Sequence, residues 1–132
     1  MKIVLKVAIG LPAVLFIVMG LRWLVAPLGI APELGFDLAD GIGRSSQIGD
    51  FAAFFLTVGI CTLLGIVSDN RVWFYPPLML LGLAALGRLL AWLLHDAALA
   101  TGMILFEIIV SLMLLGACRW LGAAAQEATP EA

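Results

Sequence analysis

Four ionisable side chains lie inside long apolar stretches of the sequence, and their types and positions could support chemistry. They are Arg22, Asp50, Arg88 and Glu107. A guanidinium group can hold an anion or a carboxylate through several N–H donors, and a carboxylate can accept those bonds or exchange a proton. A charge at the centre of a bilayer costs about 2.5 to 3.5 kcal/mol. Each of the four therefore marks an ion pair or a binding site.

Arg88 and Glu107 are predicted to form an ion pair. They lie on two successive apolar helices joined by a tight turn near residues 97 and 98. At a rise of about 1.5 Å per residue, both are roughly 14 Å from that turn. Antiparallel neighbours at equal depth can meet, and the Arg fork can give a carboxylate two parallel hydrogen bonds.

Further polar side chains recur on the same helical faces as the two acids. On the second helix a spacing of three, seven and four residues predicts one polar stripe, formed by Gln47, Asp50, Thr57 and Cys61. On the fourth helix a similar spacing predicts another, formed by Glu107, Ser111 and Cys118. The stripes could line a cavity open to the outer face. Alternatively, the polar groups hold helices together, with Gly82, Ala85, Gly102 and Gly116 allowing close approach.

The candidate ligand-binding residues include two more side chains, Arg44 and His95. His95 lies at a predicted turn and could titrate near neutral pH, although a lone loop histidine is usually only solvated. The full set is Arg88, Glu107, Asp50, Arg22, Arg44, Gln47, Thr57, Ser111 and His95. No metal site, catalytic residue or cofactor is predicted, since one histidine and two separated cysteines match no zinc spacing and no hydrolase or nucleotide motif is present.

The elements that must position these residues are transmembrane helices. Of 132 residues, 64% are apolar and only 12% are charged, about half the charged fraction of a soluble domain. Four stretches reach the roughly 20 apolar residues that a spanning helix needs: 3–25, 48–67, 73–94 and 97–121. They do not alternate as β-barrel strands do. The sequence predicts an all-α, four-helix transmembrane bundle.

Basic residues and tryptophans predict the orientation of the bundle. Lys2, Lys6, Arg71 and Arg119 lie on the side of the termini, which predicts both termini in the cytoplasm. Trp23 and Trp92 are expected at one interface, and Trp73 and Trp120 at the other. The connection 26–47 is then extracytoplasmic, either a packed cap or a lid, and 123–132 is expected to be a disordered cytoplasmic tail.

Two parts of the sequence resemble known families. The stretch Gly82-Leu-Ala-Ala-Leu-Gly87-Arg88, with Trp92, Asp96 and Glu107, resembles small bacterial four-helix membrane proteins that form a domain family of unknown function. The start of the second helix in this chain also resembles that family, with the sequence Arg44-Ser-Ser-Gln47-Ile-Gly49-Asp50-Phe51. It carries Asp50 where a small residue is expected. Gly20-Leu-Arg22-Trp23-Leu-Val-Ala-Pro27 is more loosely similar to DoxX-like membrane proteins. The resemblance implies a bacterial inner membrane location but no reaction.

The expected function is binding of a small or amphipathic ligand, or a lipid, in the outward half of the bundle. In this hypothesis Arg88 anchors an anion, Glu107 and Asp50 are its partners or proton-linked groups, and the first connection is a lid. Two alternatives remain open: a structural accessory subunit of a membrane complex, and a quinone-linked or other membrane-embedded enzyme component. The lipid bilayer is an expected partner. A homodimer, or a partner protein in a membrane complex, is compatible with this hypothesis. Nucleic acid is excluded because the net charge is −2 and no basic cluster exists.

Overall fold

The computed structural model describes the backbone of residues 2–127 and the side chains of residues 2–120. The helices, in chain order, are α1 (Lys2–Val25), α2 (Pro27–Glu33), α3 (Gly41–Ser68), the 3-10 helix η1 (Arg71–Phe74), α4 (Tyr75–Leu94) and α5 (Thr101–Glu127). Within these described residues no strand occurs. Four segments are long and apolar enough to cross a membrane: Lys2–Val25, Gly41–Ser68, Arg71–Leu94 and Thr101–Trp120. The predicted all-α four-helix transmembrane fold is confirmed.

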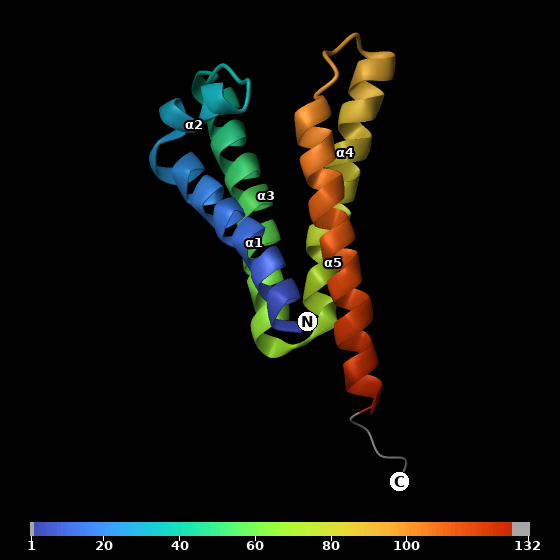
Figure 1. Ribbon diagram of the computed structural model, residues 1–132. Coiled ribbons are helices and arrows are strands. Elements are labelled where there is room, and N and C mark those ends of the chain that lie inside the picture. Colours follow the sequence, from blue (N-terminus) through green and yellow to red (C-terminus); the bar gives the residue numbers. More distant parts are fainter. Residues whose placement is uncertain (1, 128–132) are drawn as a thin grey trace.

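The long helices form two hairpins, α1 with α3 and α4 with α5 (Figure 1). The hairpins approach each other where the N-terminus and the α3–α4 connection lie, which we call the terminal end. They diverge at the opposite end, where α2 and the α4–α5 connection lie, which we call the loop end. The molecule therefore has a V shape that opens at the loop end.

The hairpin of α1 and α3 is tightly packed because glycines let the two helices approach. A Cβ atom added to Gly59 would lie 2.6 Å from the backbone oxygen of Ala13, and one added to Gly20 would lie 2.6 Å from Leu56. The glycines expected to permit close approach, Gly82 and Gly102 among them, instead face open space. That expectation was wrong because the closest helix contact belongs to the first hairpin, not the second.

The first connection is shorter and more ordered than predicted. Helix α3 begins at Gly41 rather than near residue 48, so the connection comprises residues 26–40 and contains α2. With 28 residues and a rise of about 1.5 Å each, α3 is about 42 Å long, which exceeds the roughly 30 Å hydrocarbon core. Helix α3 is therefore long enough to span that core with turns to spare.

The last helix also differs from its predicted bounds at both ends. Helix α5 starts at Thr101 instead of Ala97, after a connection in which Asp96 adopts a positive φ of 54°. It continues to Glu127, so the first part of the expected disordered tail, 123–127, is helical. Residues 128–132 of that tail lie outside the described residues.

Helix α2 folds back over the loop end of α1 and buries Trp23. Pro27 lies in its opening turn, where a missing N–H costs little. Ile30, Ala31 and Trp23 are all 0% exposed. Trp23 is thus a core residue, whereas Trp73 and Trp92 are exposed. The physical reason is that α2 supplies apolar cover that a bare helix end would lack. The depth of the tryptophans at the membrane interfaces stays a prediction.

The two hairpins are joined at the terminal end by η1. Its Phe74 is 0% exposed and packs against Gly65 of α3, whose missing side chain makes room for the ring. Asp69 ends α3 with a left-handed φ of 50° and forms a 2.6 Å ion pair with Lys6 of α1. These contacts fix the vertex of the V.

Candidate functional site

The predicted Arg88–Glu107 ion pair is present and joins α4 to α5. Arg88 Nε donates to both carboxylate oxygens of Glu107, at 3.1 and 3.3 Å. The Glu107 side chain is 7% exposed and that of Arg88 is 33% exposed. Leu94 ends α4 and Thr101 begins α5, so each member of the pair lies about 9 Å from the connection at about 1.5 Å per residue. Equal depth allows the contact, as expected.

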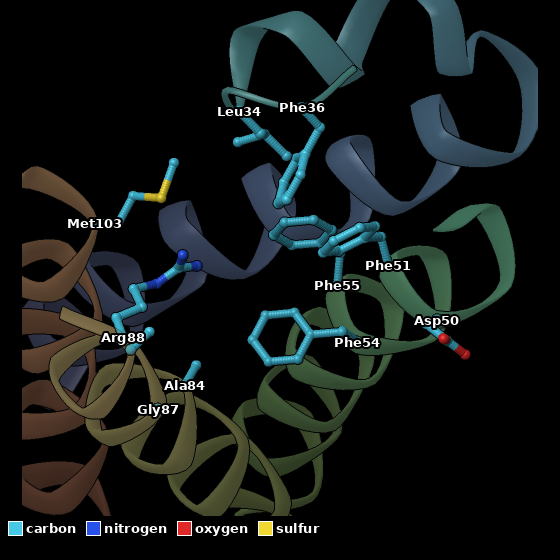
Figure 2. Close-up of a pocket in the computed structure, with 11 residues that line it drawn as sticks. Leu34, Phe36, Asp50, Phe51, Phe54, Phe55, Ala84, Gly87, Arg88 and Met103 are labelled. Atoms are coloured by element: carbon cyan, nitrogen blue, oxygen red, sulfur yellow. The ribbon is translucent and has the colours of Figure 1, made fainter. Parts of the chain in front are cut away.

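The geometry of this pair differs from the expected fork. One donor, Nε, serves both oxygens, so the terminal Nη1 and Nη2 atoms are not used by Glu107. No hydrogen bond joins either Nη atom to another of the described residues. The end of the guanidinium instead points into the space between the hairpins (Figure 2).

That space is a groove of about 470 Å³ at the loop end. One wall is aromatic and comes from α3 and the first connection: Phe51, Phe54, Phe55, Phe36 and Leu34. The other wall comes from the second hairpin, where the small residues Ala84, Gly87 and Ala91 of α4 leave room beside Arg88, and Met103 of α5 lies above it (Figure 2). The groove is thus apolar with one strong group of donors.

The first connection positions one of these aromatic side chains. After α2, Gly35 adopts a φ of 79°, and the Phe36 amide donates to the Ala31 carbonyl at 2.9 Å. This reversal places Phe36 against Phe51 in a tilted arrangement with ring centroids 4.7 Å apart, and Phe51 stacks on the buried Trp23 ring at 4.8 Å. The packing of α2 over α1 and the chain reversal that follows it therefore position Phe36 in the aromatic wall of the groove.

The aromatic wall of the groove was not predicted from the sequence. Phe51, Phe54 and Phe55 follow a spacing of three and one, which places them on neighbouring parts of one helix face. That spacing was the available signal. It was obscured because α3 is apolar all round, and aromatic residues in such a helix can face lipid as readily as a groove.

Arg22, another of the four ionisable residues in the apolar stretches, pairs with an acid outside those stretches. It forms a two-pronged pair with Glu33 of α2, Nη1 to Oε2 at 2.8 Å and Nη2 to Oε1 at 2.7 Å. The hydrogen bonds from Arg22, followed by its positive charge, hold the pKa of Glu33 below its usual value. Arg22 therefore fastens α2 to α1 and does not border the groove.

Arg44 and Gln47 also bind the first connection rather than face the groove. Arg44 donates to the Ala39 carbonyl at 2.9 Å and pairs with Asp40 at 2.7 Å. Gln47 accepts from the Ala39 amide at 2.8 Å and donates to the Asp37 carbonyl at 3.1 Å. Together they secure residues 37–40 against the first turns of α3.

The remaining predicted site residues are dispersed. Asp50 lies at the rim of the groove, with its carboxylate directed away from Arg88 (Figure 2). His95 is exposed and is the C-cap residue of α4. Neither Thr57 nor Ser111 borders the groove, although the Ser111 hydroxyl is buried and finds no hydrogen-bond partner among the described residues. The polar stripes thus do not meet in one cavity.

The residues that line the groove carry few reactive groups. The residues that line the groove include no histidine, cysteine, serine or lysine that could act as a nucleophile. Across the described part of the chain, no group of three or more metal-ligating side chains comes together. What the groove offers is hydrogen-bond donation from Arg88 between apolar walls.

Comparison of the chain with protein-family models, with curated proteins and with solved structures gives no match. The resemblance to the four-helix family of unknown function and to DoxX-like proteins therefore stays a prediction, and the site must be interpreted from its own geometry.

Proposed function

We propose that this membrane protein binds an amphipathic small molecule in the groove between its two hairpins. The observation that carries the proposal is the orientation of Arg88. Its Nε holds Glu107, while its Nη atoms point into an aromatic-lined groove (Figure 2). A group that accepts hydrogen bonds would lie at Arg88, and an apolar body would lie along Phe51 and Phe54.

The size and lining of the groove support this proposal. Sites for small molecules commonly measure about 300 to 1,000 Å³ and combine apolar walls with a few polar groups that fix orientation. A volume of about 470 Å³ with one guanidinium fits that pattern. Hydrogen bonds to Arg88 are strengthened where the surroundings exclude water. A purely structural pair would gain nothing from leaving two donors directed into a groove.

We also propose that the groove faces away from the cytoplasm, in the inner membrane of a bacterium. Lys2 and Lys6 begin α1, and Arg71 lies in the α3–α4 connection, so these basic residues gather at the terminal end. Positively charged residues favour the cytoplasmic side. The loop end, with the groove, then lies on the outer side.

The proposed function is tested by native mass spectrometry of the protein extracted gently from its own membrane. The parent should retain a small molecule that R88Q loses, because glutamine supplies a single NH2 group in place of the charged donors. The matched control is R119Q, which removes the same charge from an exposed position of α5 outside the groove. A ligand retained equally by all three proteins, or an unliganded parent that copurifies with another protein, would contradict the proposal; the second result favours an accessory subunit.

A further inference from the structure

The charges around the groove do not favour an anion. Two ionisable side chains border it, Arg88 and Asp50, and Glu107 is paired directly behind Arg88. The charge of Arg88 is therefore already balanced by Glu107, while the Asp50 carboxylate at the rim is directed away from Arg88 (Figure 2). The other basic residues at the loop end are already matched, Arg22 by Glu33 and Arg44 by Asp40. The groove carries donors without an excess of positive charge.

We propose that the ligand's head group is an uncharged hydrogen-bond acceptor, such as an ester, ketone or amide carbonyl, attached to an apolar chain or ring. This inference rests on the proposed function and specifies its ligand class. A carbonyl oxygen accepts from the Nη atoms of Arg88 and brings no charge into the groove. It thereby avoids the cost of burying an unbalanced charge.

An anionic head is disfavoured by the fixed position of Glu107. Its side chain is 7% exposed and is held by Arg88 Nε at 3.1 Å, so it cannot turn into solvent when an anion arrives. A bound anion would place a second negative charge on the same guanidinium, and like charges repel strongly in surroundings of low dielectric constant. The expected role of Arg88 as an anion anchor is thus replaced by a role as a neutral donor site.

A cationic head is disfavoured for a different reason. The Nη atoms of Arg88 only donate hydrogen bonds, so an ammonium group would face donors of its own sign. The Asp50 carboxylate, which could attract a cation, is directed away from the groove (Figure 2). A neutral acceptor is the head group that satisfies Arg88 and leaves the Arg88–Glu107 pair intact.

The test compares two probes of equal chain length, the methyl ester of a long-chain fatty acid and the corresponding alkyl sulfonate. The protein is held in nanodiscs of ether-linked zwitterionic phospholipid, whose molecules carry no ester carbonyl, and occupancy is followed by native mass spectrometry. The parent should bind the ester at least about tenfold more tightly than the sulfonate, a difference of about 1.4 kcal/mol.

The E107Q variant should cancel this preference. Glutamine keeps an acceptor for Arg88 Nε and leaves the guanidinium with a net positive charge, so sulfonate affinity should rise by about tenfold or more relative to the ester. The matched control is E33Q, which removes one carboxylate at the same end but outside the groove. Loosening of α2 should weaken both probes alike, so the preference of E33Q for the ester should equal that of the parent. Circular dichroism establishes that both variants are folded.

Each result separates this inference from the proposed function. A parent that prefers the sulfonate, or an E33Q variant that shifts as E107Q does, overturns the neutral head group while leaving a binding groove in place. If neither probe binds the parent, or if R88Q binds both as the parent does, the binding groove itself is refuted.

The source of the carbonyl is resolved by repeating the titration in ester-linked lipid. Loss of probe binding there would identify a bilayer lipid as the occupant, because the bulk lipid competes through its own ester groups. Undiminished binding would identify a free amphipathic molecule. Both results uphold an uncharged acceptor at Arg88.

Discussion

At the scale of single residues, Arg88 divides its donors between two tasks. Its Nε secures Glu107, and its Nη atoms face the groove. Glu107 in turn is the more enclosed member of the pair, and Arg88 compensates the cost of burying its charge. Removing either partner therefore has consequences for stability as well as for binding.

The R88A variant should lower the free energy of unfolding by about 3 kcal/mol. The value is at the low end for a broken buried pair, about 3 to 5 kcal/mol, because a third of the Arg88 side chain is exposed. The double variant R88L/E107L should recover most of the loss, since no unpaired charge remains. Reversible unfolding in mixed micelles, followed by circular dichroism, measures both. An R88A protein as stable as the parent would show that the pair contributes nothing.

At the scale of helices, stability is concentrated in the hairpin of α1 and α3. Gly59 and Gly20 bring the two backbones close, and Phe16 stacks on Phe55 with centroids 5.9 Å apart. Within the part of the α4 and α5 hairpin whose side chains the structure describes, no glycine makes a comparable contact, since Gly82, Gly87, Gly102 and Gly116 face open space. The first hairpin thus forms the more rigid wall of the groove.

G59A should destabilise the protein by about 1 to 3 kcal/mol, the usual cost of overpacking. The added methyl group would lie 2.6 Å from the Ala13 carbonyl oxygen, and that backbone atom cannot move aside without separating the helices. The matched control G82A lies in α4 with nothing within 4 Å. It should be neutral or stabilising by up to about 1 kcal/mol, because alanine favours helix more than glycine does. Equal effects of the two substitutions in the same unfolding assay would refute this packing model.

The attachment of α2 to α1 should weaken at acidic pH. Pairing with Arg22 lowers the pKa of Glu33 in the folded state. A lowered folded pKa means that the stabilisation is fully present above the unfolded value of about 4.3 and is lost as pH falls through the folded pKa. Hydrogen exchange of the α2 amides should therefore accelerate below about pH 4.3.

The control for this pH dependence is E33Q, in which α2 exchange should be faster than in the parent at neutral pH and should lack that acid-dependent step. Exchange rates are corrected for the intrinsic effect of pH on unstructured amides. An E33Q protein with the parent's acid-dependent step would assign the titration to another group.

At the scale of the whole molecule, the V shape decides where a ligand can enter. The vertex is closed by Phe74 against Gly65 and by the Lys6–Asp69 pair, whereas the hairpins diverge at the loop end (Figure 1). Access to the groove therefore depends on which side of the membrane the loop end occupies.

Single cysteines placed at Asp37 and at Asn70 should report opposite sides of the membrane. Both positions are exposed, the first at the loop end and the second at the terminal end. In a background without Cys61 and Cys118, a membrane-impermeant thiol reagent applied to intact spheroplasts should label position 37 alone. Position 70 should react only after lysis. The reverse pattern would place the groove on the cytoplasmic side.

The sequence by itself determined the four spans and the Arg88–Glu107 pair, because hydropathy and depth along a helix depend only on local composition and a constant rise per residue. The tertiary structure decided the rest. Arg22 meets Glu33 only because α2 folds back over α1, and Phe51 and Phe54 form a groove wall only because the hairpins diverge. A helix that is apolar on every side does not reveal which face turns inward. Which face of a helix turns inward, and which side chains pair, depend on contacts between segments distant in the chain.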